Sequence, residues 1–163
     1  MMEMMQNVEE PTIRVVYATG NPGKFEEASW VFGRRERAED PRVLTCALDP
    51  YVTEIQGTME EIARSKSEAT YQALFVDLSQ EREKMQEKIV ASLDGPVEYL
   101  LTEDVSLSIN ALCGFPGPYV KPMLEAIRPD GLWDLMSRYS DRSATATCMM
   151  LMKCMKTMTT RVF

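Results

Sequence analysis

The feature that most constrains the fold is an apolar run that ends in a glycine-containing turn. Residues 13–18, with the sequence IRVVYA, are rich in β-branched side chains and stop just before Gly20, which predicts a buried strand. Asn21 is placed to cap a helix that begins at Pro22, and this helix should end near Gly33. A strand, a tight turn and a helix in this order indicate that the chain opens as an α/β unit.

The rest of the chain continues to alternate between strand and helix patterns. Thr58 and Glu61 have the spacing of a capping box, so a long helix should begin there, with an apolar stripe that runs from Ile62 to Val76. The alternation indicates an α/β fold in which at least part of the sheet is parallel. Further strands are predicted over residues 42–48, 97–102 and 141–152, and two short helices should follow the turn at residues 113–118, the second beginning at Asp130.

One segment departs from this alternation. Residues 79–89, with the sequence SQEREKMQEKI, are strongly charged, and they form either a solvated continuation of the long helix or an exposed insertion. A chain of 163 residues is long enough for one domain with a proper core and too short for two comfortable ones. We therefore expect a single domain over residues 1–163, with an insertion at about residues 78–94.

The composition excludes several classes of function. The net charge of −7 argues against a nucleic-acid-binding surface, because such surfaces contact phosphates with Lys and Arg. The chain has no histidine, so a Ser-His-Asp mechanism is impossible. The four cysteines show no CxxC spacing, and we expect reduced, mostly buried thiols in a cytoplasmic protein. No apolar run is long enough for a signal peptide or a membrane span.

The turn after the first predicted strand is a candidate phosphate-binding loop. Glycines let a backbone approach a phosphate, the start of a helix presents N–H groups and a partial positive charge, and Lys24 adds a full charge. The turn is neither a Walker A loop nor a dinucleotide-binding fingerprint, since both need more glycines at fixed offsets. These residues alone favour an ordinary strand-to-helix turn with a solvated lysine. The candidate binding residues are Thr19, Gly20, Asn21, Pro22, Gly23 and Lys24.

Two adjacent carboxylates, Glu103 and Asp104, follow the third predicted strand directly, so at least one of them should lie at a sheet edge that faces a cleft. A hard cation such as Mg²⁺ is held by one or two carboxylates together with substrate phosphates, and Asp104 with Glu54 would be enough. By spacing alone, Glu54 is only a loop glutamate. Lys66 falls on the apolar stripe of the long helix, either as a lysine whose stem packs on the core or as a cation directed into a cleft.

Four sequence blocks match, in order, the pattern of one known family. They are TGN at residues 19–21 with Lys24, EIQG at residues 54–57 with Lys66, EDVSL at residues 103–107 followed by GFPGPYVK at residues 114–121, and DRSA at residues 141–144. On these blocks the chain resembles the inosine triphosphate pyrophosphatases, and the eukaryotic members in particular. The resemblance covers nearly the whole chain from Ile13 to Phe163, and the third block is its most specific part.

The resemblance implies a fold, a reaction and a set of roles. The family fold is a long, mixed, twisted sheet flanked by helices, in two lobes around a central cleft. Its members are usually homodimers that convert ITP, dITP and XTP to the monophosphate and pyrophosphate. Thr19, Asn21 and Lys24 would bind the triphosphate with help from Lys66. Glu54 and Asp104 would hold Mg²⁺, or Mn²⁺ in its place, while a carboxylate activates water for attack on the α-phosphorus.

The sequence also departs from the family pattern. Val105, in the substrate site, stands where the family usually has Ser or Thr, so one hydroxyl contact to the phosphates is missing. The charged insertion is absent from typical members and should be exposed to solvent. Family members continue past the position of Phe163 with a Phe-Gly-Trp-Asp block and a Ser-His-Arg block that read the base, and we expect this chain to lack both. Two alternatives are a truncated, catalytically weak member that binds nucleotide or dimerises, and a related pyrophosphatase for modified pyrimidine nucleotides, which lacks the Gly-Phe-Pro-Gly-Pro signature.

Overall fold

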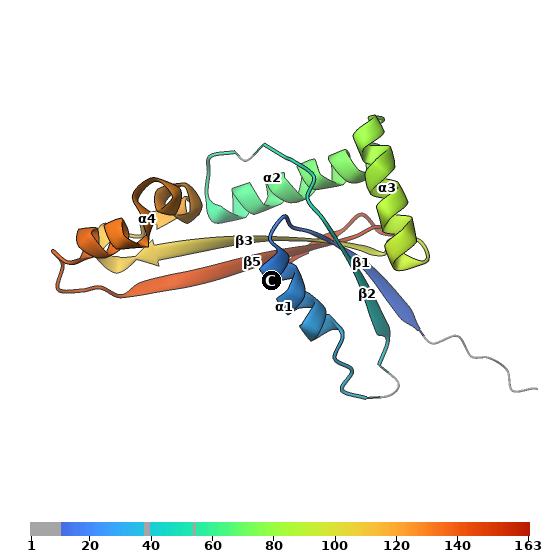
Figure 1. The fold of residues 1–163 in the computed structure, drawn as a ribbon, viewed down its shortest axis with the longest axis horizontal. Helices are drawn as coiled ribbons and strands as arrows, with labels where there is room; N and C mark the ends of the chain where they lie inside the picture. The colour runs from blue at the N-terminus through green and yellow to red at the C-terminus, as the bar shows by residue number, and fades with distance from the viewer. Residues whose placement is uncertain (1–10, 38–39, 54) are drawn as a thin grey trace, which may run out of the picture.

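The computed structural model describes residues 11–37, 40–53 and 55–163, and these form one sheet with helices packed against it (Figure 1). The strands are β1 (Thr12–Ala18), β2 (Arg42–Leu48), β3 (Tyr99–Ile109), β4 (Pro116–Gly117), β5 (Ala144–Cys154) and β6 (Thr160–Val162). The helices are α1 (Pro22–Phe32), α2 (Met59–Tyr71), α3 (Gln80–Leu93) and α4 (Val120–Met136), with a π-helical turn over Gln72–Val76 and a 3₁₀ turn over Asn110–Leu112.

The sheet is mixed, with the strand order β2-β1-β3-β5-β6 and with β4 paired to β3. β1 pairs in parallel with both β2 and β3, whereas β3 pairs antiparallel with β5 along its whole length. The expected α/β class with a mixed, twisted sheet is therefore confirmed. Figure 1 shows β1, β2, α1 and α3 gathered at one end of the long β3–β5 ribbon and α4 at the other end, which gives the molecule two lobes.

The first strand and helix form as the sequence predicts. β1 lies between two strands, and its residues from Val15 to Ala18 are buried, which explains why its apolar run is continuous rather than alternating. Asn21 caps α1 and Pro22 occupies its first position. One face of α1, with Phe25, Ala28 and Phe32, packs against a cluster formed by Val15, Tyr17 and Leu101.

α2 begins at the predicted capping box, in which the Thr58 hydroxyl and the Glu61 carboxylate exchange hydrogen bonds with each other's backbone N–H groups. Ile62 is buried, as the predicted stripe requires. The stripe is wrong at its far end, because the π-helical turn after α2 changes the helical phase. Leu74 is 0% exposed there, while Val76 is 46% exposed.

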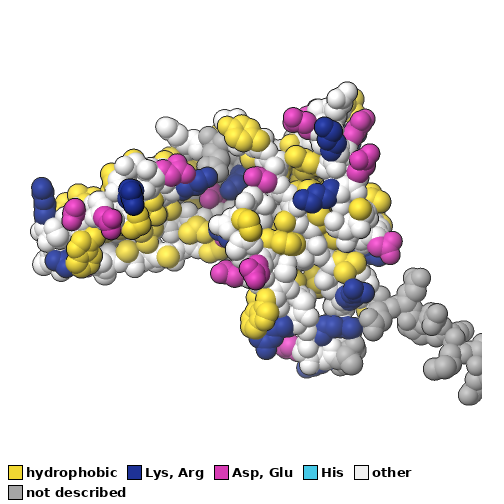
Figure 2. Space-filling model, viewed as in Figure 1, with side chains coloured by type: hydrophobic (Ala, Val, Ile, Leu, Met, Phe, Trp, Pro, Cys, Tyr) yellow, Lys and Arg dark blue, Asp and Glu magenta, His cyan; other side chains and the backbone are white. Residues whose placement is uncertain are grey.

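The charged segment forms a separate helix, α3, which Ser79 caps. Ile89 and Leu93 are four residues apart and share one face of the helix, and both are buried in the core with Val16 and Leu100. Figure 2 shows acidic and basic side chains on the visible surface of this region. The expectation of an exposed segment is therefore wrong for the inner face of α3, which completes the core on this side of the sheet.

β3 is longer than predicted, and this changes the surroundings of the two candidate carboxylates. The sequence predicts that the strand ends at Thr102, but it continues to Ile109. The reason is that β5 still supplies hydrogen-bonding partners after the parallel pairing with β1 stops at Thr102. Glu103 and Asp104 therefore lie inside a strand, directly beyond the last parallel pair, instead of at its end.

α4 contains a sharp break. The backbone at Arg128 is non-helical, with φ 61° and ψ 167°, and Pro129 follows it. The residue before a proline is disfavoured in the helical region, which explains the position of the break. The second part of α4 therefore begins close to Asp130, as predicted, although the two short helices form one kinked element.

Two expectations based on composition have different outcomes. All four cysteines are free, as expected for reduced thiols. Only Cys46 is buried, while Cys113 and Cys148 are exposed, so the expectation of mostly buried thiols is wrong. Within residues 11–37, 40–53 and 55–163, no helix has the length and apolar character needed to cross a membrane.

Candidate active site

The candidate phosphate loop connects β1 to α1 and is held by local hydrogen bonds. The Asn21 backbone N–H donates to Thr19 Oγ1 at 3.1 Å, and Asn21 Oδ1 accepts from the backbone N–H groups of Gly23 and Lys24 at 3.0 and 3.3 Å. These N–H groups are therefore occupied by the cap, contrary to the expectation that the helix start presents them to a ligand. The partial positive charge of the helix and the Lys24 ammonium remain to attract a phosphate.

Asp49, which follows β2, approaches the same loop closely. A Cβ at Gly20 would lie 2.1 Å from Asp49 Oδ2, so any other residue at position 20 would displace this carboxylate. A cavity of about 480 Å³ is lined by both segments and by Lys88 and Ser92 of α3. The charged segment thus forms part of the surroundings of the loop, which the sequence alone did not indicate.

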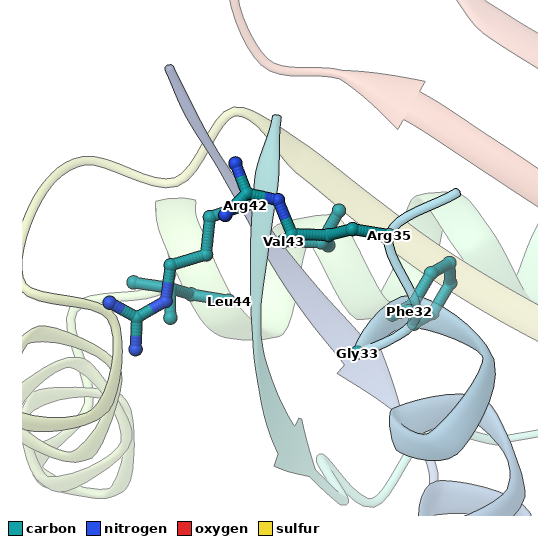
Figure 3. Close-up of a pocket in the computed structure, with 6 residues that line it drawn as sticks. All are labelled: Phe32, Gly33, Arg35, Arg42, Val43 and Leu44. Atoms are coloured by element: carbon teal, nitrogen blue, oxygen red, sulfur yellow. The ribbon is translucent and has the colours of Figure 1, made fainter. Parts of the chain in front are cut away.

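A second hollow, of about 460 Å³, lies at the start of β2 (Figure 3). Arg35 donates from Nε and from one terminal nitrogen to the carbonyl oxygen of Asp40, at 2.9 and 2.7 Å. Ligands in α/β sheets bind beyond the carboxyl ends of parallel strands, so this hollow at an amino end is not the candidate site. It is lined by Phe32, Gly33, Arg35, Arg42, Val43 and Leu44.

Glu103 joins three elements at the carboxyl end of β1. Lys24 Nζ of α1 donates to Glu103 Oε1 at 2.7 Å, and the Tyr17 hydroxyl of β1 donates to Glu103 Oε2. Burial and this hydrogen bond raise the pKa of Tyr17. Burial also acts to raise the pKa of Glu103, but the Lys24 ammonium and the Tyr17 hydroxyl outweigh it and hold that pKa below its ordinary value. The contact between Tyr17 and Glu103 was not predicted from the sequence, because no local pattern reports a contact with a strand so far along the chain.

Asp104 lies on the opposite face of β3 from Glu103, because consecutive side chains in a strand alternate. By the same alternation, Glu103 shares the face of Leu101, on which α1 packs, and Asp104 shares the face of Leu100. Lys66 of α2 donates its Nζ to the backbone oxygen of Glu103 at 3.4 Å. Tyr71 of α2 packs on the face of Leu100, so α1 and α2 lie on opposite faces of the sheet. Lys24 reaches the carboxylate of Glu103 from one face, and Lys66 reaches its backbone oxygen from the other.

Val105 follows these carboxylates and is half-buried. Its backbone N–H donates to Asp104 Oδ1 at 3.1 Å, while its side chain offers no polar group to a ligand. Ser106 is 5% exposed, and the alternation of the strand puts it on the face opposite to Val105. The neighbouring hydroxyl therefore does not replace the one that position 105 lacks, as expected for an extended segment.

Asp104 is the one predicted metal ligand that lies among the described residues. Glu54, the second predicted ligand, lies outside the described residues. Across the described ranges, no group of three or more His, Cys, Asp or Glu side chains is arranged to hold a metal. Asp104 forms no salt bridge within these ranges. One or two carboxylates are enough for Mg²⁺, which completes its shell with phosphate oxygens and water, so the half-buried Asp104 carboxylate fits this ion.

The candidate site lies within the range of the chain that matches a known protein family. The model of the Ham1 family matches residues 15–163. The chain belongs to the Ham1 family. The matched range contains the loop after β1, both lysines and both carboxylates of β3. The whole candidate site therefore belongs to the part of the chain that the family model matches.

Two fungal relatives of this Ham1-family chain are inosine triphosphate pyrophosphatases. The protein of Ajellomyces capsulatus is 36% identical over 132 residues, which cover 81% of this chain and 56% of the relative. The protein of Aspergillus fumigatus is 31% identical over 138 residues, which cover 85% of this chain and 58% of the relative. The chain thus spans little more than half the length of these relatives.

Two solved structures share the fold of this chain. The Ham1 protein of Staphylococcus aureus aligns with a TM-score of 0.61 at 24% identity, covering 92% of this chain and 67% of that one. A nucleoside-triphosphatase, described as a dITP/XTP pyrophosphatase, from Mycobacterium abscessus aligns with a TM-score of 0.57 at 16% identity, covering 93% of this chain and 70% of that one. At these identities the similarity establishes the fold alone.

Proposed function

We propose that this chain hydrolyses the non-standard purine nucleoside triphosphates ITP, dITP and XTP to the nucleoside monophosphate and pyrophosphate. The observation that carries the proposal is that Lys24 binds the Glu103 carboxylate and Lys66 binds the Glu103 backbone oxygen, which brings one ammonium to each face of the strand beside the Glu103–Asp104 pair. Cations on both sides of a carboxylate pair suit a polyphosphate whose leaving group is itself an anion. The names of the fungal relatives support the same reaction.

The loop after β1 would receive the triphosphate. The Thr19 oxygen accepts the Asn21 N–H, which leaves the Thr19 hydroxyl proton for a phosphate oxygen. Lys24 supplies a positive charge from the start of α1, and Lys66 supplies one from α2. Because the backbone N–H groups of Gly23 and Lys24 are capped, these side chains carry most of the phosphate recognition.

Asp104, with Glu54, would hold Mg²⁺, or Mn²⁺ in its place. Such an ion supplies positive charge to the phosphate oxygens and acidifies a bound water. One of these two carboxylates would accept the proton of the attacking water as the water oxygen bonds to the α-phosphorus. The bond from the α-phosphorus to the bridging oxygen breaks, and pyrophosphate leaves with that electron pair, its charge offset by Lys24 and Lys66.

Replacement of the Asp104 carboxylate tests whether this side chain takes part in the hydrolysis. Asp104→Asn keeps the size of the side chain and removes its charge, so it should lower pyrophosphate release from ITP by about a hundredfold or more, the scale of losing one electrostatic group in an active site. Release is measured with a coupled phosphate assay in the presence of Mg²⁺, and circular dichroism confirms that the variant folds. Asp134→Asn, a matched change at an exposed position of α4, should keep the wild-type rate. A wild-type rate in Asp104→Asn would refute the role of Asp104.

A second candidate function is nucleotide binding without efficient turnover. It is favoured by one observation, the Val105 side chain, which offers no polar group to a ligand next to Asp104. ITP binding measured by calorimetry without any pyrophosphate release would identify this function, and steady turnover would eliminate it. In either case we propose that the chain acts as a homodimer.

A further inference from the structure

Tyr17 and Lys24 bind the two oxygens of the same carboxylate. Lys24 Nζ lies 2.7 Å from Glu103 Oε1, and the Tyr17 hydroxyl donates to Glu103 Oε2. Tyr17 is 1% exposed and its ring packs in the cluster with Val15 and Leu101, so its hydroxyl has a fixed position in the sheet. The lysine side chain is 34% exposed and extends from the first turn of α1.

Tyr17, Glu103 and Lys24 differ in side-chain flexibility. The more rigid side chain of each contact therefore orders the more flexible one. A lysine side chain has four rotatable bonds and loses rotamer entropy when it is ordered, so an exposed ammonium has no fixed position by itself. A tyrosine has only two rotatable side-chain bonds, and its packing in the core removes their freedom. Tyr17 therefore fixes the Glu103 carboxylate, and the carboxylate in turn fixes the Lys24 ammonium.

We propose that Tyr17 and Glu103 are positioning residues, which hold the Lys24 ammonium beside the loop of residues 19–24 so that it meets the polyphosphate of a ligand. The ammonium has three donors, and Glu103 takes one of them, which leaves two for phosphate oxygens. Neither positioning residue touches the ligand. The inference rests on the proposed function in one respect, namely that this loop receives a polyphosphate.

The test measures binding of inorganic tripolyphosphate by calorimetry, in the presence of EDTA so that no metal contributes. Tyr17→Phe removes one hydroxyl and keeps the ring, and it should weaken binding about fivefold, a size typical of coupled neighbouring groups. Glu103→Asp keeps the negative charge but shortens the side chain by one methylene, so it cannot reach both partners and should weaken binding by a similar factor. Because the charge is unchanged, this loss reports the position of Lys24 and not the local potential.

The decisive comparison is made in a Lys24→Met background. If Tyr17 acts through Lys24, Tyr17→Phe should have no further effect on tripolyphosphate affinity once the ammonium is gone. Tyr99→Phe is the matched control, because Tyr99 packs against the same cluster, and it should bind like the wild type. Unchanged affinity in both Tyr17→Phe and Glu103→Asp would overturn the inference, and so would equal losses from Tyr17→Phe with and without Lys24.

Failure of the proposed function gives a different result. A wild-type chain that binds tripolyphosphate in a Lys24-dependent manner but releases no pyrophosphate from ITP would refute the hydrolysis and leave the positioning role standing. A chain that hydrolyses ITP but binds tripolyphosphate equally well with Lys24→Met would refute the positioning role and leave the hydrolysis standing.

Discussion

Lys153 shows how a single charged residue is accommodated in the core. Among the described residues it is the one buried charged side chain, at 7% exposure. A buried ammonium without a partner would be costly, but Lys153 Nζ donates to Glu68 Oε2 at 2.7 Å and lies 4.5 Å from the centre of the Tyr71 ring. These contacts connect β5 to α2, the helix that also carries Lys66.

The pair predicts a component of stability that depends on pH. The pKa of Glu68 is held below its ordinary value of 4.5, because Lys153 and Gln72 donate hydrogen bonds to its carboxylate. A lowered pKa in the folded state stabilises the protein above pH 4.5, and this contribution is lost as the pH falls through the folded pKa. Glu68 is more than half exposed, so the contribution should stay below about 1 kcal/mol after solvent screening.

Urea unfolding from about pH 7 to about pH 3 measures this component. Glu68→Gln should be less stable than the wild type at neutral pH, and the difference should shrink on acidification. Glu60→Gln is the matched control on the same helix. Both side chains of the Glu60–Arg64 pair are exposed to solvent, so this change should have little effect on stability. A constant difference between Glu68→Gln and the wild type across this range would contradict the assignment.

At the scale of elements, β3 determines where the candidate site lies. The residues before Glu103 pair with β1 and β5, and those after it pair with β5 and β4. The site therefore forms where the parallel part of the sheet stops and the antiparallel ribbon continues, between the helices α1 and α2. This position brings a lysine to each face of the strand.

α3 is the element whose contribution to stability can be isolated most cleanly. Leu93 is fully buried, whereas Val90 on the same helix is 63% exposed. Leu93→Ala should lower the free energy of unfolding by about 2–5 kcal/mol, and Val90→Ala should change it by less than about 0.5 kcal/mol. Urea unfolding followed by circular dichroism measures both. Equal effects would mean that α3 does not pack as the structure shows.

Local patterns in the sequence predicted the elements that depend on neighbouring residues. The cap at Asn21 and the capping box at Thr58 each depend on residues no more than three positions apart, and the structure contains both. The extension of β3 could not be predicted, because it depends on pairing with β5, about forty residues further on. The burial of Leu93 and the contact of Tyr17 with Glu103 likewise depend on packing between distant elements. The candidate residues could therefore be named from the sequence, but the contacts between them could not.

In the whole molecule, the chain has the fold of the Ham1 family, and it spans 56–58% of the length of the two fungal relatives compared above. The candidate site lies within this shared part. The proposed chemistry uses Lys24, Lys66 and Asp104, which belong to the described residues, together with Glu54, which does not. We therefore expect that bond cleavage can occur in this chain, with the attacking oxygen joining the α-phosphorus.

Hydrolysis of ITP in ¹⁸O-labelled water shows which phosphorus atom the water attacks. The products are separated and analysed by mass spectrometry, and Asp104→Asn serves as the inactive comparison. We expect that inosine monophosphate carries the label and that pyrophosphate carries none, because water attacks the α-phosphorus. Release of labelled inorganic phosphate, or label in the pyrophosphate, would contradict the proposed reaction.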